Sequence, residues 1–490
     1  MTPPSAPAAA PASAPTPARQ RWLFLLTLMV GTMASVMSST IINVAIPGMS
    51  HYFALGQARA QWATSSFMLA MTVSMLTTPW LLGRFGYRRT YLGTMTLLLA
   101  GGVLGGLAED FNVVLAARVI EGLAAGVVQP IPAILIMRAF RIDEQGKATG
   151  LFTMGVVLAP ALGPSVGGVL LELWGWRAIF FMVVPLCAAA FALSLRWVPD
   201  TVPGGRRPGP GSQGQALDWI GLLLASLGTL ALLNAMVRLH ATSLAPAAAL
   251  LASAGLLWGL FLRWQRRLAR QSQADARAQP LLNLAVFSHP AYVMGCVVAF
   301  IYGAALFGST YLLPVYMLLG AGLSAAHVGT VLLPAGLVLA AVIPVAGRLA
   351  DQLPPYRLVM GGLALLGLSF ALMPTLQLDS GVLALSLYTL LGRVGLGFIL
   401  PALNLGAMRA LDKTQIAQGA SLINFVRMLG GAIGVSLCGV ALEWRASARG
   451  QSLVTPELTV ERLRAFDDVF LALAVLCLLA VAAAWRMRRT

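Results

Sequence analysis

Two residues of opposite charge inside a long apolar segment are the best candidates for chemistry in this sequence. Arg118 and Glu121 stand three residues apart in the run ARVIEGLAAG, so a helix would place them on one face within pairing distance. A charged side chain at the centre of a bilayer costs at least about 2.5–3.5 kcal/mol, so each one needs a partner or a task. Glu121 and Arg118 are therefore candidates for proton coupling.

Two interpretations of this pair are open. In the first, protonation of Glu121 switches Arg118 between the carboxylate and other partners, either backbone or substrate. Burial and the neighbouring arginine act in opposite directions on the proton affinity of Glu121, so solvent access would decide its state. In the second, the two side chains form a static ion pair that only neutralises a buried arginine.

Other polar residues of the apolar segments are candidates for the wall of a substrate cavity. We expect Arg393 and Arg427 to bond helix-end carbonyls, with a cavity-facing role as the alternative. Polar or adaptable side chains suit a cavity wall, although packing and bonds to the residue's own helix compete for the same groups. The candidates are Ser38, Asn43, Tyr311, Met317, Asn424 and Arg427.

The composition places all of these residues in a membrane. Of the 490 residues, 58% are hydrophobic and 10% charged, whereas soluble domains have about 25% charged residues. The net charge of +16 is spread over short gaps between apolar runs, without a nucleic-acid-binding motif, so we expect no nucleic-acid partner. The four cysteines lie in apolar runs without CxxC spacing, and we expect no disulfide, metal or cofactor.

Fourteen apolar runs approach the about 20 residues that a spanning helix needs. They cover residues 23–46, 62–82, 91–108, 113–137, 148–171, 178–197, 219–237, 244–264, 291–317, 325–346, 358–376, 382–405, 417–442 and 469–485. The outer segment 443–468 carries four arginines among mixed charges and could include an interfacial helix.

These runs define the predicted domain organisation. With both termini in the cytoplasm, 23 of the 33 lysines and arginines fall on cytoplasmic segments, if Arg196 and Arg263 at the cytoplasmic ends of their spans are included, 7 fall on outer loops and 3 lie deep within spans. We therefore expect a multi-pass protein of the cytoplasmic (inner) membrane. The predicted parts are a disordered tail (1–21), a six-helix bundle (22–197), a linker (198–216), two extra helices (217–265), a basic connector (266–289) and a second six-helix bundle (290–487).

An internal repeat relates the two bundles. PWLLGRFGYRR (79–89) aligns with GRLADQLPPYR (347–357), a shift of 268, and GVVQP (126–130) aligns with GFILP (397–401), a shift of 271. The same order in both halves indicates a parallel repeat. The predicted fold is an all-α polytopic membrane protein with two six-helix bundles in parallel repeat and two extra central helices.

Small residues recur every four positions in GVVLAPALGPSVGG (155–168). On a helix they would form a ridge without bulk that a neighbouring helix can approach closely, and the prolines favour a bend. We expect a bendable, tightly packed helix that acts as a gate. Its residues are Gly155, Ala159, Pro160, Gly163, Pro164, Gly167 and Gly168.

Taken in order, these segments resemble the major facilitator superfamily, specifically its fourteen-span drug/proton antiporter branch. APALGPSVGG is similar to the fifth-span antiporter motif, ARVIEGLAAGVVQP to the fourth-span motif, and PWLLGRFGYRR with its repeat GRLAD to the loop motif after the second span. MSSTIINVAIP (37–47) is similar to the first-span signature. PLLNLAVFSHPAY, YLLPVYM and GASLINFVRMLGGAIGV are similar to landmarks of the second half.

The resemblance implies a secondary transporter, not an enzyme, that exports small lipophilic compounds by alternating access in exchange for protons. It also implies that Arg84 and Asp351 belong to a cytoplasmic latch between spans. Alternatives are a dedicated exporter of one endogenous metabolite or siderophore, an uptake permease on the same fold, and, more remotely, a polytopic membrane enzyme or sensor. The expected partners are the lipid bilayer, the substrate and protons; a periplasmic adaptor protein stays open, although no sequence feature points to one.

Four positions depart from the family pattern. The first-span signature normally has an Asp where this chain has Ser38, and the fourth-span motif has a Gln where this chain has Glu121. The loop motif normally opens with Gly and carries an Asp, and the corresponding positions here are Pro79 and Gly83. A substrate cavity with one carboxylate and up to three arginines would bind polycations weakly. We therefore expect neutral or weakly acidic lipophilic substrates.

Overall fold

The computed structural model describes residues 18–202, 216–239, 245–271, 280–377, 381–451 and 459–488, and the regular elements in these ranges are helices. Twelve described stretches are long and apolar enough to span a membrane. One of them, Trp62–Gly106, contains two spans, because the chain reverses at Gly86, whose φ of 76° suits glycine. Helix α7 (Gln145–Trp174) is one more span. The described residues thus form the fourteen spans that the sequence predicts.

The N-terminal bundle contains the first six spans. They are α1 (Ala18–Tyr52), α3 (Trp62–Ser74) continued by η1 (Met75–Thr77) into α4 (Thr78–Gly106), α5 (Phe111–Val128) continued by α6 (Ile131–Ala139), α7, and α8 (Arg177–Trp197), with a short α2 (Gln57–Ala60) after α1. Pro130 and Pro132 separate α5 from α6, because a proline lacks the N–H that the helix ladder requires.

The C-terminal bundle repeats this arrangement. Its spans are α11 (Pro290–Val315) continued by a π turn, η4 (Tyr316–Gly320), α12 (Ala325–Gln352), α13 (Pro355–Leu372) continued by η5 (Met373–Thr375), α14 (Val382–Arg409), α15 (Ile416–Ala448) and α16 (Val460–Arg486); η3 (Leu284–Ser288) leads into α11. Helix α1 packs on α7 and α8 as α11 packs on α15 and α16, and α3 packs on α5 as α12 packs on α14. The predicted parallel repeat is confirmed.

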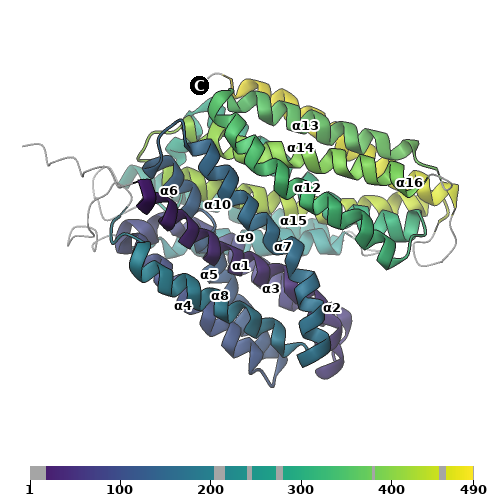
Figure 1. Ribbon diagram of the computed structural model, residues 1–490, viewed down its shortest axis with the longest axis horizontal. Coiled ribbons are helices and arrows are strands. Elements are labelled where there is room, and N and C mark those ends of the chain that lie inside the picture. The colour runs from purple at the N-terminus through teal and green to yellow at the C-terminus, as the bar shows by residue number, and fades with distance from the viewer. Residues whose placement is uncertain are drawn as a thin grey trace, which may run out of the picture.

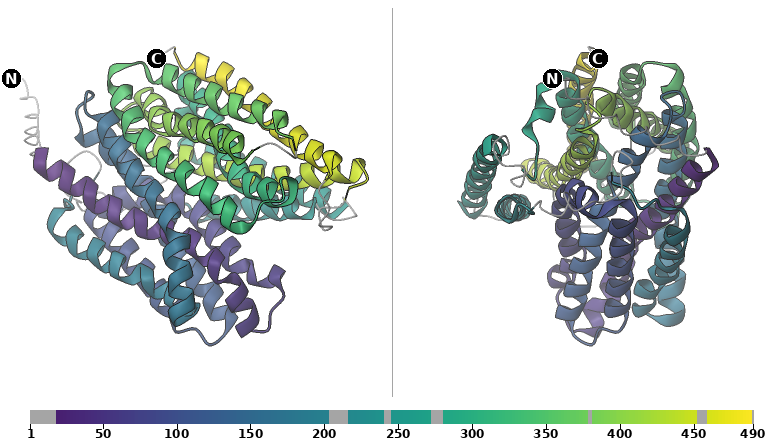
Figure 2. Two further views of the ribbon diagram at one scale, coloured as in Figure 1. Left: turned by 45° about the vertical axis from the view of Figure 1, so that its right-hand side comes forward. Right: turned by 90° about the vertical axis from the view of Figure 1, so that its left-hand side faces the viewer.

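The two extra helices, α9 (Trp219–Arg238) and α10 (Ala245–Gln271), form a hairpin beside the bundles, as the right panel of Figure 2 shows. Asp218 joins its two arms, because its carboxylate accepts hydrogen bonds from the α9 backbone at Gly221 (2.8 Å) and from Trp264 (2.8 Å) and Gln265 (2.6 Å) of α10. Helix α9 touches α3 of one bundle and α15 of the other. The pair is therefore inserted between the halves in sequence and lies beside them in space.

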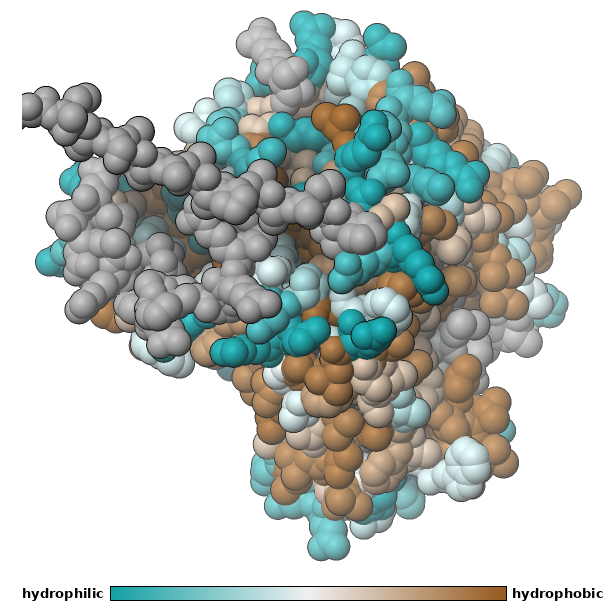
Figure 3. All heavy atoms as spheres, turned by 60° about the vertical axis from the view of Figure 1, so that its left-hand side comes forward, coloured by the Kyte–Doolittle hydropathy of each residue, from teal (hydrophilic) through white to brown (hydrophobic). Residues whose placement is uncertain are grey.

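The start of α1 and the end of α16 lie at the same end of the molecule, which we call the terminal face (Figure 2). Hydrophilic residues gather on this face, whereas apolar side chains cover the flanks of the helices (Figure 3). The two bundles are closest there and diverge toward the opposite face (Figure 1). The predicted tail, except for its last residues, most of the linker, and residues 272–279 of the connector lie outside the described residues.

The segment 443–468 on the opposite face consists mainly of helix ends. Helix α15 continues to Ala448 and α16 begins at Val460, so the described part of this segment extends the spanning helices and contains no separate interfacial helix. Arg449 joins the two helices through Glu461 (3.2 Å) and Asp468 (2.6 Å).

Candidate functional site

A cavity of about 400 Å³ lies between the two bundles. The N-terminal bundle contributes residues from α1, α3, α6 and α7 to its wall, and the C-terminal bundle contributes residues from α11, α12, α14 and α15. Most lining side chains are apolar, and no acidic side chain is found among the described residues that line it. The polar lining residues are Ser39, Thr40, Gln129, Thr149, Thr153, Tyr302, Thr310, Arg393, Asn404, Asn424 and Arg427.

Two arginines of the C-terminal bundle face this cavity. Arg427 donates one hydrogen bond to the Asn424 side chain (2.8 Å), and Asn424 in turn donates to the carbonyl of Ala420 (2.8 Å). Arg393 forms no hydrogen bond or ion pair with any residue that the structure describes. The bonds to helix-end carbonyls that the sequence led us to expect are thus missing at both positions in the described structure.

The structure divides the candidate cavity residues into two groups. Asn424 and Arg427 line the cavity, as does Pro160 of the α7 motif. Ser38, Asn43, Tyr311 and Met317 are not among the described lining residues. Ser38 is buried against Arg118, Asn43 accepts a hydrogen bond from Thr64 (3.0 Å), Tyr311 is partly exposed, and Met317 is buried in the π turn that ends α11.

Arg118 and Glu121 form a buried ion pair on α5. The Arg118 Nη1 atom lies 2.5 Å from Glu121 Oε2 and donates to Ser38 Oγ of α1 at 2.8 Å. Arg118 Nε donates to the carbonyl of Ala63 on α3 (3.0 Å), and the guanidinium lies 4.2 Å from the ring centroid of Phe67. Both charged side chains are 1% exposed. One arginine therefore connects three helices in a site that is closed to solvent.

Glu121 retains capacity for a further hydrogen bond. Its Oε1 atom is buried and has no hydrogen-bond partner in the described structure. Gly101 and Gly102 of α4 make room for this side chain, since a Cβ atom at Gly101 would lie 2.5 Å from Glu121 Cγ. A carboxylate oxygen without a partner can accept a proton without the loss of an existing bond.

The ion pair and the cavity share two helices. On α1, Ser38 contacts Arg118, while the next two residues, Ser39 and Thr40, line the cavity. On α3, Phe67 stacks on Arg118, while Met68 lines the cavity. A change in the charge of the pair therefore acts on helices that form the cavity wall.

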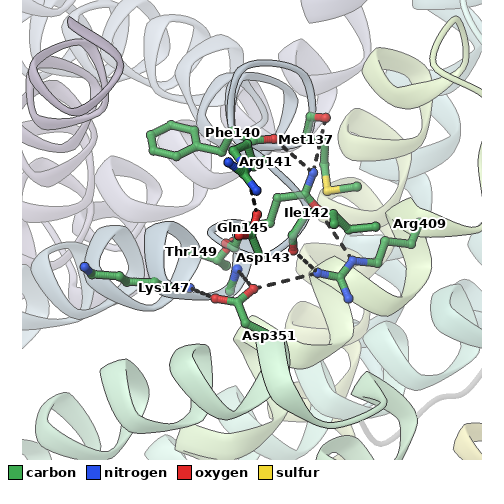
Figure 4. A network of polar contacts seen from close by, with 11 residues as sticks. Met137, Phe140, Arg141, Ile142, Asp143, Gln145, Lys147, Thr149, Asp351 and Arg409 are labelled. Atoms are coloured by element: carbon green, nitrogen blue, oxygen red, sulfur yellow. Dashed lines mark hydrogen bonds and ion pairs between the residues drawn. The ribbon is translucent and has the colours of Figure 1, made fainter. Parts of the chain in front are cut away.

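At the terminal face, one carboxylate joins the two bundles (Figure 4). Asp351, at the end of α12, accepts hydrogen bonds from the backbone N–H groups of Gly146 (2.6 Å) and Lys147 (2.8 Å) in the first turn of α7. The positive end of the α7 dipole favours an anion at this position. Arg409 of α14 lies 3.8 Å from Asp351 and donates to the carbonyl of Ile142 (2.9 Å).

The helices at this contact approach closely because both have glycines there. A Cβ atom at Gly150 of α7 would lie 3.0 Å from the Cα of Gly347 on α12, and one at Gly347 would lie 2.7 Å from the Cα of Gly150. Arg84, the other predicted latch residue, stacks on Trp80 (5.4 Å) and Phe85 (5.6 Å) of its own segment.

The small residues of the α7 motif face α1. A Cβ atom would meet Met29 at Gly155, Thr40 at Gly163 and Ile41 at Gly167, whereas Gly168 has open space. Ala159 is fully buried, and the side chain of Pro164 lies outside the described residues. At these positions the lack of a side chain lets α1 pack closely on α7.

The fold has counterparts among known proteins. The family model of the Major Facilitator Superfamily matches residues 28–435. The chain belongs to this superfamily. Among its curated relatives, the drug efflux pump JefA of Mycobacterium tuberculosis is 29% identical over 439 residues, which are 88% of this chain and 82% of that protein. The multidrug resistance protein B homolog of the same organism is 28% identical over 457 residues, 90% of this chain and 82% of that protein.

Other members of the superfamily share the fold at lower identity. The human organic anion transporter MFSD10, in its crystal structure, is 14% identical in sequence to this chain. The two structures superpose with a TM-score of 0.63 over 96% of this chain and 100% of that one. The proton:xylose symporter XylE is 11% identical, with a TM-score of 0.66 and coverage of 96% of both chains. At these identities the likeness concerns the architecture.

Proposed function

We propose that this protein is a secondary transporter that exports small lipophilic compounds and takes up protons through Glu121 in exchange. The observation that carries the proposal is a largely apolar cavity between two bundles, with a buried acidic residue on helix α5 that packs directly on the cavity helices α1 and α3. Relatives named as a drug efflux pump and as a multidrug resistance protein B homolog support export as the direction of transport.

Proton coupling follows from the contacts of Arg118. When Glu121 is ionised, Arg118 is neutralised by it and also bonds Ser38 and Ala63. When Glu121 takes up a proton, the guanidinium loses its counter-ion and depends on its partners on α1 and α3 for stabilisation. Because a buried uncompensated charge is costly, the two protonation states favour different positions of these helices.

Alternation of access would use the contact at the terminal face. In the present conformation Asp351 and the glycines of α7 and α12 hold the bundles together at that face. Breaking this contact would let the cavity open there. The segments that carry most of the lysines and arginines lie on the same side of the membrane as both termini, and such an excess is typical of the cytoplasmic side. We therefore assign the terminal face to the cytoplasm and the protein to the cytoplasmic membrane.

A transport assay with a drug panel tests this proposal. The purified protein is reconstituted in proteoliposomes in the orientation in which the vesicle lumen corresponds to the cell exterior. We then follow uptake of each compound into the vesicles, with an acidic lumen and without a pH gradient. We expect accumulation of lipophilic compounds that depends on the gradient. Equal accumulation without the gradient, or none for any compound, would contradict the proposal.

A further inference from the structure

The cavity contains two cationic groups that proton coupling does not use. Arg393 of α14 and Arg427 of α15 both line it. Each is the twelfth residue of its helix, so about 17 Å of helix separates it from the nearer helix end. At this depth neither guanidinium reaches the membrane surface, and each must be stabilised within the protein or by a ligand.

The described residues of the protein supply little of that stabilisation. Arg393 has no hydrogen bond or ion pair, and Arg427 has one hydrogen bond, to Asn424 (2.8 Å). Tyr302 of α11 lines the same cavity, but its phenol carries no negative charge that could balance the arginines. With no acidic side chain among the described lining residues, an apolar cavity contains two cations and no counter-ion.

Such a pair of arginines is suited to one kind of ligand group. A guanidinium binds a carboxylate through two parallel hydrogen bonds, and charge-assisted bonds of this type are strong where water is scarce. The wall contributed by the N-terminal bundle is different, since it includes Met68, Met71, Met137 and Phe152. Methionines adapt to irregular apolar shapes, so this wall suits a hydrocarbon or aromatic body of variable form.

We propose that Arg393 and Arg427 form a binding site for the anionic headgroup of a lipophilic carboxylate, whose apolar body lies against the methionine-rich wall of the N-terminal bundle. This inference rests on the proposed export function and makes its substrate class specific. Asn404 and Asn424 line the same region and offer amide donors to an oxygen anion.

A matched set of fluorescent probes tests the site. The probes are 11-(dansylamino)undecanoate, its methyl ester, and the corresponding undecylammonium compound, titrated against the full chain in lipid nanodiscs with empty nanodiscs as background. We expect the carboxylate to bind at least tenfold more tightly than either of the other probes. Arg393→Gln and Arg427→Gln should each weaken carboxylate binding about tenfold or more and leave ester binding unchanged.

Two control variants make this result specific. Arg266→Gln removes an exposed arginine of α10 and should change the affinity of no probe. Arg393→Lys keeps the charge without the bidentate geometry and should retain part of the carboxylate preference. It also tests whether the loss of carboxylate binding in Arg393→Gln reflects misfolding. Equal wild-type affinity for acid and ester, or an equal loss for both probes in the arginine variants, would overturn the proposal.

Efflux of the same probes separates this proposal from the proposed function. If the ester is exported in a gradient-dependent way but the carboxylate has no advantage in binding, the anion site is wrong and export stands. If the carboxylate binds as expected but no probe is transported, the anion site stands and export is wrong.

Discussion

Replacement of Glu121 by glutamine removes the carboxylate that pairs with Arg118 and leaves a buried guanidinium. Both side chains are 1% exposed, and the Nη1 to Oε2 distance is 2.5 Å. Loss of one partner of a buried ion pair costs about 3–5 kcal/mol, and we expect about 3 kcal/mol because the glutamine amide oxygen can still accept a hydrogen bond. Glu121→Gln should therefore lower the melting temperature and abolish efflux driven by a pH gradient.

The geometry also predicts where a second carboxylate would restore both properties. Ser38 Oγ lies 2.8 Å from the same Arg118 Nη1 atom, so an aspartate at position 38 would approach the same guanidinium from α1. We expect Ser38→Asp in the Glu121→Gln background to recover most of the lost stability, about 2 kcal/mol, together with gradient-driven efflux. Efflux and thermal unfolding are measured on the same preparations.

A neighbouring residue gives a matched control for this rescue. Ser39 lines the cavity and donates to the carbonyl of Val36 (2.7 Å), so an aspartate there would not reach Arg118 in the same way. Ser39→Asp in the Glu121→Gln background should restore neither stability nor coupling. Full gradient-driven efflux in Glu121→Gln, or equal rescue by aspartate at position 39 and at position 38, would refute the role assigned to Glu121.

Two further predictions concern the contact at the terminal face. Asp351→Asn removes the anion that accepts hydrogen bonds from the first turn of α7 and should weaken the contact by about 1–2 kcal/mol, which shifts the population toward opening at that face about tenfold. Distances between spin labels on the two bundles measure this shift. The control is Asp143→Asn, which removes an exposed carboxylate paired with Arg141 and should cause no shift. Gly150→Val should force the two bundles apart at the same face and reduce transport, because a Cβ atom at position 150 would lie 3.0 Å from the Cα of Gly347 on α12. The control is Gly168→Val, which should transport normally because a side chain there meets open space. A terminal face that stays closed in the Gly150 variant would contradict this packing.

The sequence predicts the fold because each span is a local pattern. Apolar length and the repeat at 79–89 and 347–357 can both be read along the chain, and they predict fourteen helices in two related bundles. The structure adds the chain reversal at Gly86 inside the first copy of that repeat. The pair of Arg118 and Glu121 is equally local, since three residues on a helix define one face.

The parts of the site that the sequence did not predict depend on contacts between distant segments. Ser38 is 80 residues from Arg118, and Asp351 is 204 residues from Lys147, so no periodicity links them. Which face of α14 turns toward the cavity is likewise a tertiary property, because a span that is apolar all round gives no inward direction. For this reason the sequence favours a bond from Arg393 to helix-end carbonyls over a cavity-facing position, whereas the structure places Arg393 in the cavity wall.

Proton release on substrate binding tests the central claim most directly. The compound with the highest gradient-dependent efflux is added to the purified protein in weakly buffered solution, and a pH-indicator dye reports protons released. Wild-type protein should release protons on binding, and Glu121→Gln should bind the compound without release. Equal release by both proteins would contradict the assignment of Glu121 as the proton-coupling residue.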